Sequence, residues 1–201
     1  MNKTIVNFQE PFLKLKQWLI EAKKSYQQLK LENYNAATLS TVSLHNQPSS
    51  RIVLIKNIDE DGLVFYTNLN SKKAHEIANN NKVSILFYWE VLKKQIRIEG
   101  VATLLTKEES EVYFNSRPYL SKIGAWASKQ SAEMQNISEL KIRVVKYLLK
   151  HKLTVPKPDF WSGYRIKPIY FEFWEEGKFR LHNRKAYSKV TDGFEVKLIY
   201  P

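Results

Sequence analysis

Two cations at the ends of one apolar segment are the first residues that could do chemistry. In residues 51–56, RIVLIK, Arg51 and Lys56 flank four apolar residues. Such a run is typical of a buried strand, so both charges are expected at its rims. At about 3.3 Å per residue, their α-carbons lie roughly 16 Å apart. That spacing favours two separate anions, or one long ligand, over a single phosphate. The alternative is that both charges only improve solubility.

A second group of cations lies where a strand is expected to give way to a helix. Residues 65–75 read FYTNLNSKKAH, which places Lys72 and Lys73 in the first helical turn. A helix N-terminus carries unpaired N–H groups and a partial positive charge, so lysines are unfavourable there and an anion is favourable. A bound phosphate would offset the repulsion. We therefore predict a phosphate site at this position.

A third segment combines a phenol, a guanidinium and hydroxyls. In residues 113–121, YFNSRPYLS, Tyr113 and Arg117 are four apart and would share one helix face. With a nearby hydroxyl they could form a second oxyanion pocket. A helix end stabilised by an arginine is the alternative.

A fourth segment, residues 179–184, reads FRLHNR. In a strand, Arg180, His182 and Arg184 would occupy one face and Leu181 the other. Three such groups on one face favour an anion or solvent beside them. Taken alone, His182 could equally be a structural histidine.

The composition limits the class of protein. The chain has 201 residues, with 43% hydrophobic and 26% charged residues, which is usual for a globular protein. It has no cysteine and only four histidines, none at i, i+4 spacing, so we expect no disulfide and no metal site. A net charge of +12 favours anionic partners. No apolar run reaches the ~20 residues of a membrane span, and the polar N-terminus does not resemble a signal peptide. We therefore expect a cytoplasmic protein.

The elements that would position these residues are strands in series with helices between them. Apolar periodicity, turn residues and a capping box beginning at Thr106 predict the following elements. Helices are expected at 11–29, 71–79, 106–116 and 138–151, and strands at 37–44, 51–57, 63–68, 82–89, 94–105, 166–174, 178–184 and 194–200, with a loop at 124–131. This order favours a mainly β, α+β fold in one domain, 1–201. Closure into a small barrel would remove exposed strand edges.

Together these segments resemble the pyridoxamine 5′-phosphate oxidase family. The matching segments are RIVLIK (51–56), FYTNLNSKKAHEI (65–77), KKQIRIEG (93–100), YFNSRP (113–118), IGAWASKQS (123–131), FWSGYR (160–165) and FRLHNR (179–184). The resemblance implies a Greek-key-like, FMN-binding split β-barrel with peripheral helices. It also implies a homodimer, with dimerisation strands in residues 166–201 and an FMN site at each of two interfacial positions.

The resemblance also implies roles for individual residues. The implied FMN contacts are Arg51, Ile52, Val53, Leu54, Ile55, Lys56, Tyr66, Thr67, Lys72, Lys73, Gln95, Gln130, Ser131, Trp161 and Arg184. The implied substrate contacts are Lys56, Tyr113, Arg117, Ser121, Arg180, Leu181 and His182. Of these, Arg180 and His182 would lie over the pyridine ring as catalytic residues.

The implied reaction is oxidation of pyridoxamine or pyridoxine 5′-phosphate to pyridoxal 5′-phosphate, with O₂ as acceptor and H₂O₂ released. Two features depart from the family pattern. The segment before the first helix is short, and Asn183 stands where the family motif RLHDR has Asp.

Two other interpretations remain open. The same fold and flavin could serve another substrate, as in phenazine-precursor oxidases or flavin reductases. Retention of the phosphate-binding residues argues against this. A non-enzymatic basic β-barrel that binds nucleic acid through exposed aromatic residues is the other interpretation. The position of many aromatic residues in expected core strands, beside aliphatic residues, argues against it.

Overall fold

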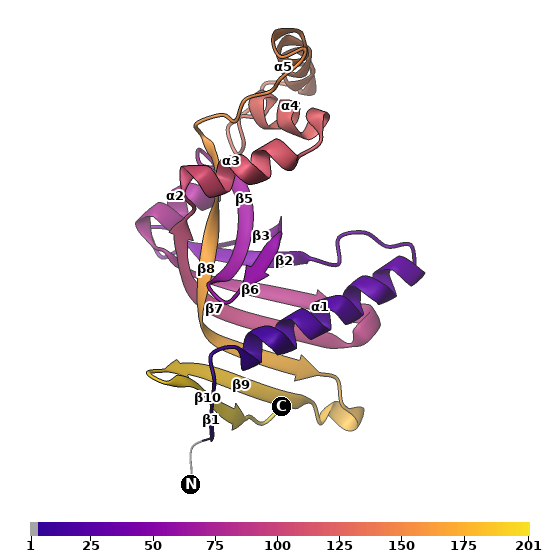
Figure 1. Cartoon of the computed structure of the whole chain (residues 1–201), viewed down its shortest axis with the longest axis vertical. Coiled ribbons are helices and arrows are strands. Elements are labelled where there is room, and N and C mark those ends of the chain that lie inside the picture. Colours follow the sequence, from indigo (N-terminus) through magenta and orange to yellow (C-terminus); the bar gives the residue numbers. More distant parts are fainter. Residues whose placement is uncertain (1–3) are drawn as a thin grey trace.

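One antiparallel sheet forms the body of the protein (Figure 1). The computed structural model describes residues 4–201, and within them ten strands pair in the order β1-β10-β9-β8-β7-β6-β2-β3, while β5 pairs with both β4 and β8. The strands are β1 (Thr4–Val6), β2 (Ala36–Val42), β3 (Pro48–Leu54), β4 (Asn57–Asp59), β5 (Gly62–Asn68), β6 (Lys82–Trp89), β7 (Lys94–Leu104), β8 (Trp161–Glu175), β9 (Asn183–Val190) and β10 (Gly193–Leu198). The expected mainly β, α+β class is confirmed.

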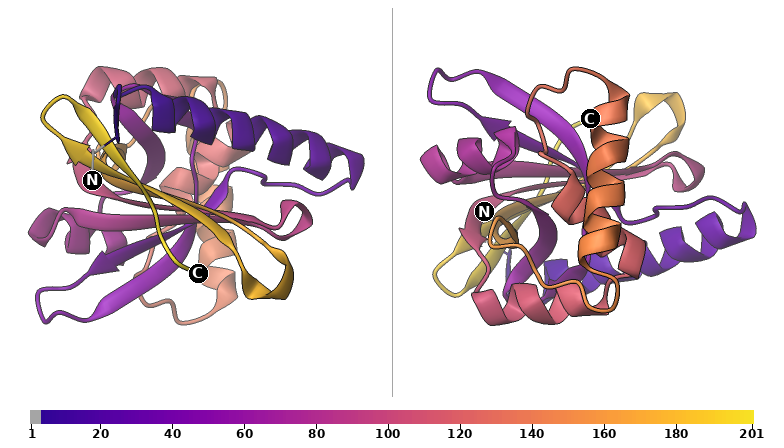
Figure 2. Two further views of the ribbon diagram at one scale, coloured as in Figure 1. Left: turned by 90° about the horizontal axis from the view of Figure 1, so that it is seen from below. Right: turned by 90° about the horizontal axis from the view of Figure 1, so that it is seen from above.

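Five α-helices lie beside and beyond this sheet. They are α1 (Glu10–Gln28), α2 (Lys72–Asn79), α3 (Lys107–Ser116), α4 (Tyr119–Ala127) and α5 (Ile137–Lys150) within the described residues. Helix α1 packs along the sheet, whereas α3, α4 and α5 gather at one end of it (Figure 1). Seen from above, α5 crosses that end (Figure 2). None of the helices in residues 4–201 combines the length and apolarity needed to cross a membrane.

Strand β8 connects the two parts of the sheet. Its first residues pair with β5, as in Gly163 opposite Tyr66, and its last residues pair with β9, while β7 runs along its other edge from Tyr164 to Glu175. Gly163 permits this close approach, because a β-carbon there would lie 2.5 Å from the carbonyl oxygen of Phe65. The 15 residues of β8 therefore position side chains at two distant places.

Aromatic side chains join α1 to the sheet. Phe12 and Trp18 are buried and meet Phe171 and Phe173 edge to face, with ring centroids 5.3 and 5.1 Å apart. Leu15 completes the buried stripe of α1 at helical spacing. The predicted amphipathic helix at 11–29 is confirmed.

The predicted loop at 124–131 is wrong in its first half, because α4 continues to Ala127. Ile123 and Ala127, four residues apart, are buried. Ser121 and Lys122 are the polar residues of the other side of α4, and its last turn bears Gly124, Ala125 and Trp126. The polar stripe by which amphipathic helices are recognised in sequence is therefore limited to the first part of this helix.

The predicted strand at 178–184 is also wrong in its first part. Residues 178–180 form a single 3₁₀ turn in which Phe179 and Arg180 have φ of 55° and 64°, and β9 begins only at Asn183. Glu175 and Asn183 already pair, so the chain must reverse between them. Arg180, His182 and Arg184 consequently do not share one strand face.

The N-terminal segment adds a strand that the sequence did not indicate. Strand β1 pairs with β10, with Thr4 opposite Val196. The first three residues of the polar segment judged unlike a signal peptide lie outside the described residues.

Replacing Trp18 tests the packing of α1. The Trp18→Ala variant should lower the free energy of unfolding by about 3–5 kcal/mol, because it leaves a cavity beside Phe173. Ile20→Ala on the exposed side of the same helix should change it by no more than about 0.5 kcal/mol. Urea denaturation at one protein concentration measures both values. Equal losses would show that α1 is not held through Trp18.

Candidate functional site

A cavity of about 640 Å³ lies where β3 and β5 meet α3 and α4. Most of the residues predicted to contact ligands line it. They are Ile52, Val53, Leu54, Lys56, Tyr66, Thr67, Lys73, Tyr113, Arg117, Ser121, Gln130 and Trp161. Segments that are far apart in the chain thus converge on one cavity.

Lys73 places a buried positive charge in this cavity. Its ammonium donates to Thr67 Oγ1 at 3.1 Å, Ser71 Oγ at 3.3 Å and Gln130 Oε1 at 3.0 Å. All three acceptors are neutral, and no carboxylate of residues 4–201 forms an ion pair with Lys73 at hydrogen-bonding distance. Burial, followed by the nearby charge of Arg51, lowers the pKa of Lys73. A cation so placed is prepared to bind an anion.

Arg51 faces a different group of residues. Its guanidinium donates to Thr41 Oγ1 and, at 3.0 Å, to Glu76 Oε2. Burial alone would raise the pKa of Glu76, but hydrogen bonds from Thr41 and Arg51 outweigh it and lower the pKa. Lys72 is largely exposed, with its ammonium 3.9 Å from Glu76 Oε1. Of the three predicted phosphate cations, only Lys73 lines the cavity.

Stacked aromatic rings form one wall of the cavity. The rings of Tyr66 and Tyr113 lie 3.9 Å apart and nearly parallel, and the Trp161 ring lies nearly parallel to both, 5.3 Å from Tyr66 and 6.3 Å from Tyr113. The guanidinium of Arg117 lies 4.9 Å from the Trp161 ring. The predicted convergence of Tyr113 and Arg117 is therefore observed, with the capping box at Thr106 and Glu109 starting the helix that carries Tyr113.

Arg117 is a second cation in the cavity. Its Nη1 is buried and has no hydrogen-bond partner among the described residues. Burial lowers the pKa of Arg117. An unpartnered buried guanidinium nitrogen is costly unless a ligand accepts its hydrogen bond. The cavity therefore offers two places for anionic groups, at Lys73 and at Arg117.

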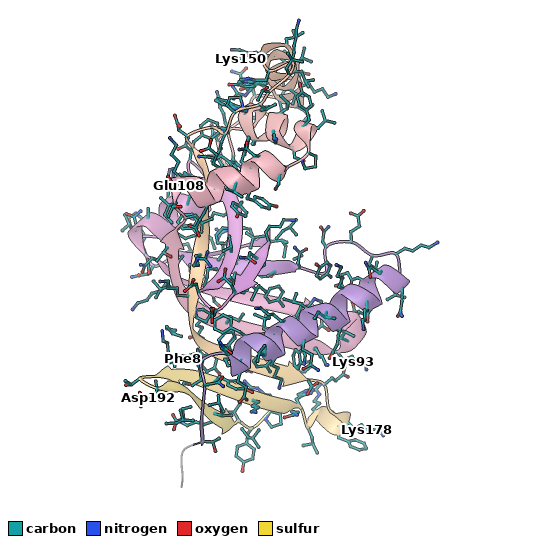
Figure 3. The ribbon with its side chains drawn as sticks, in the orientation of Figure 1. Phe8, Lys93, Glu108, Lys150, Lys178 and Asp192 are labelled. Atoms are coloured by element: carbon teal, nitrogen blue, oxygen red, sulfur yellow. The ribbon has the colours of Figure 1, made fainter. Side chains whose placement is uncertain are left out.

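The remaining predicted residues form a second group at the other end of β8. Gln95, Trp174 and Arg184 lie side by side on β7, β8 and β9. The ring of His182 lies 4.7 Å from that of Trp174. Figure 3 shows Lys178, in the adjoining turn, far from Glu108 of α3. From Trp161 to Trp174, β8 extends roughly 40 Å, so one chain does not bring the two groups together.

Hydrogen bonds fix the orientation of two residues in this second group. Glu172 is buried and accepts from Arg184 Nε at 2.9 Å and Nη2 at 2.7 Å. The Nδ1 atom of His182 accepts from the Gly177 N–H at 3.3 Å. A neutral His182 then carries its proton on Nε2, where it can donate to a ligand. Arg180 and Leu181 are exposed in the turn.

Some residues of the site were missed or lie elsewhere. Ile55 is buried in the core, and Ser131 lies outside the cavity. Asn68, Ser116, Pro118, Gly124, Ala125 and Ser128 line the cavity but were not predicted. Gly124 and Ala125 belong to α4 and Ser128 follows it directly, so recognising this helix would have indicated these three residues. Trp174 was missed because its position beside Gln95 and Arg184 depends on strand register.

Comparison with known proteins finds family models and relatives that match nearly the whole chain. The family model described as pyridoxamine 5′-phosphate oxidase matches residues 22–151. The model described as the pyridoxine 5′-phosphate oxidase C-terminal dimerisation region matches residues 161–201. A pyridoxine/pyridoxamine 5′-phosphate oxidase of Pelagibacter ubique is 42% identical, over 98% of this chain and 94% of the relative. Another, from Chelativorans sp., is 41% identical over 96% and 91%.

A solved structure shares the fold. The crystal structure of PhzG from Burkholderia lata 383, in complex with tetrahydrophenazine-1-carboxylic acid, superposes with a TM-score of 0.87. It is 28% identical and the match covers 95% of this chain and 92% of that one.

Inorganic phosphate tests the anion site at Lys73. Phosphate should stabilise the flavin-free protein by about 1 kcal/mol or more, a rise of roughly 2–4 °C in melting temperature for a chain of this size. Lys73→Met should abolish the rise, because it removes the buried charge. Lys82→Met, on an exposed lysine that does not line the cavity, should keep it. Differential scanning fluorimetry at constant ionic strength measures the effect. Loss in both variants alike would contradict a specific role for Lys73.

Proposed function

The chain belongs to the pyridoxamine 5′-phosphate oxidase family, and from this we propose that it oxidises pyridoxamine or pyridoxine 5′-phosphate to pyridoxal 5′-phosphate. FMN is the cofactor, O₂ is the electron acceptor and H₂O₂ is released. When bound, FMN supplies the redox chemistry by accepting a hydride from the substrate and passing the electrons to O₂. The protein supplies binding, orientation and charge.

Three cations line the cavity, and the observation that carries this proposal is that two of them, Lys73 and Arg117, have buried nitrogen atoms while Lys56 is exposed. Lys73 is surrounded by neutral acceptors, and Arg117 has a buried nitrogen without a partner among the described residues. A cofactor and a substrate that each carry a phosphate would satisfy both. We assign the FMN phosphate to Lys73 and the substrate phosphate to Arg117.

The other predicted contacts divide between these two anions. We assign Thr67 and Gln130, which accept hydrogen bonds from the Lys73 ammonium, to the FMN phosphate site. Arg51 and Lys72 are assigned to the same site. Lys56, Tyr113 and Ser121 line the cavity with Arg117 and belong with the substrate. Fixed phosphates at both positions would hold the reacting groups of cofactor and substrate in register.

We propose that the partner subunit of a homodimer completes each site. Arg180, His182 and Arg184 lie in the region matched by the dimerisation model, and Gln95 pairs with Trp174 of that region. They are too far from the cavity of their own chain to act there. In this assignment Arg180 and the Nε2–H of His182 orient the substrate, while Gln95 and Arg184 contact FMN. Leu181 adds an apolar contact.

We also propose that the fold is a split β-barrel. Strands β5 and β8 close against each other while β7 and β9 extend the sheet beyond them, which fits a split β-barrel. We treat residues 1–201 as one domain, because β8 belongs to both parts of the sheet. Location in the cytoplasm remains a prediction.

Oxidation of a phenazine precursor is the second candidate, because the PhzG structure shares the fold. The two anion positions favour a phosphorylated substrate instead. With pyridoxamine 5′-phosphate, the purified yellow protein should consume O₂, whereas unphosphorylated pyridoxamine should react at least about 100-fold more slowly, since loss of charge-assisted contacts costs roughly 3 kcal/mol. An oxygen electrode measures both rates. No uptake with the phosphorylated amine would contradict the proposed activity.

Mixed dimers test whether each site is shared between subunits. Arg117→Ala and Arg180→Ala homodimers should each lose most turnover while keeping FMN. Random mixing should restore about a quarter of wild-type activity, because half the dimers are mixed and each has one intact site. The matched control mixes wild type with the variant that carries both substitutions in one chain. Its mixed dimers have no intact site, so the activity should not exceed that of the wild-type homodimers in the mixture. If the single variants fail to complement each other, the shared site is wrong.

A further inference from the structure

A buried carboxylate lies among the cations assigned to the cofactor phosphate. We propose that Glu76 is the counter-ion of this phosphate site. It holds Arg51 in place when no phosphate is bound, and it weakens phosphate binding once a phosphate arrives. This inference rests on the proposed function, because it takes the FMN phosphate as the ligand.

The geometry makes Glu76 a positioning residue for Arg51. The side chain of Glu76 is 5% exposed and accepts from Thr41 Oγ1 at 2.5 Å and from Arg51 Nη2 at 3.0 Å. The other terminal nitrogen of Arg51 donates to Thr41 Oγ1 and to the Leu39 carbonyl oxygen. Helix α2 contributes Glu76 to this closed network, strand β3 contributes Arg51, and strand β2 contributes Thr41 and Leu39. The guanidinium therefore has few alternative positions.

The same carboxylate offsets a repulsion between cations. Arg51 lowers the pKa of Lys73, whereas Glu76 raises it, so both charges act on the buried ammonium. Lys72 adds a third cation, 3.9 Å from Glu76 Oε1. Three cations and one carboxylate leave a local charge that a phosphate monoester, with about 1.5 to 2 negative charges at pH 7, can neutralise.

A bound phosphate would take over the role of Glu76. The two anions would then share the same cations within a poorly solvated site and repel each other. Glu76 thus stabilises the flavin-free protein at the expense of affinity for FMN. Riboflavin carries the same ring system without the phosphate, so its affinity should not depend on the charge of Glu76.

The Glu76→Gln variant tests this directly, because it removes the charge and keeps the shape and an acceptor for Arg51. Flavin-free protein is titrated with FMN and with riboflavin, and quenching of flavin fluorescence gives both dissociation constants. We expect FMN to bind about tenfold more tightly to the variant, with riboflavin affinity unchanged. The melting temperature of the flavin-free variant should fall. Thr41→Val is the matched control: it loosens the network but keeps the charge, so it should lower the melting temperature without increasing the preference for FMN.

The outcomes separate this inference from the proposed function. If wild type binds neither flavin, the proposed function fails. If wild type prefers FMN but the Glu76→Gln variant shows an unchanged or smaller preference, only the counter-ion role is wrong. Should the variant be unstable without flavin, purification with excess FMN should recover it. Failure to recover it even then would show a purely structural role for Glu76 and overturn the inference.

Discussion

The rest of the site depends on one constraint, which is the length of β8 and its pairing with the neighbouring strands. One end of this strand pairs with β5 and carries Trp161 into the cavity wall, and the other end pairs with β9 and carries Trp174. Because an extended strand of this length cannot fold back on itself, its two functional ends remain apart. In the proposed homodimer, a two-fold axis can place one end of each β8 near the opposite end of its partner.

The parts of the site that the sequence could predict are those with local signals. A serine followed by two lysines indicated the start of α2, and the buried ammonium of Lys73 lies at that start. The capping box at Thr106 fixed α3, so the spacing of Tyr113 and Arg117 alone placed both on one side of the cavity. In each case helix geometry converts a short sequence separation into a contact, without knowledge of the rest of the fold.

The parts that could not be predicted depend on contacts between distant segments. Arg51 was expected at a strand rim, but it lies within β3, which begins at Pro48, and its guanidinium donates to Thr41 and to Glu76 of α2. Period-two spacing suggested a strand through Arg180, but the pairing of Glu175 with its partner on β9 forces a turn there. The sequence marks neither Glu76 as the partner of Arg51 nor Asn183 as the strand neighbour of Glu175. Contacts between distant segments therefore decide where these cations lie, while the sequence pattern indicates only their approximate position.

The departure at Asn183 shows how such a pairing constrains a single residue. Asn183 is exposed and lies directly opposite Glu175 on the neighbouring strand. A carboxylate at that position would face a second carboxylate, and like charges directly opposite in an antiparallel pair destabilise it. The amide avoids this repulsion while the adjacent Arg184 keeps its buried partner, Glu172. Asn183 is thus compatible with the pairing of β8 and β9. The carboxylate that orients Arg184 is Glu172 of β8, which lies outside the segment 179–184.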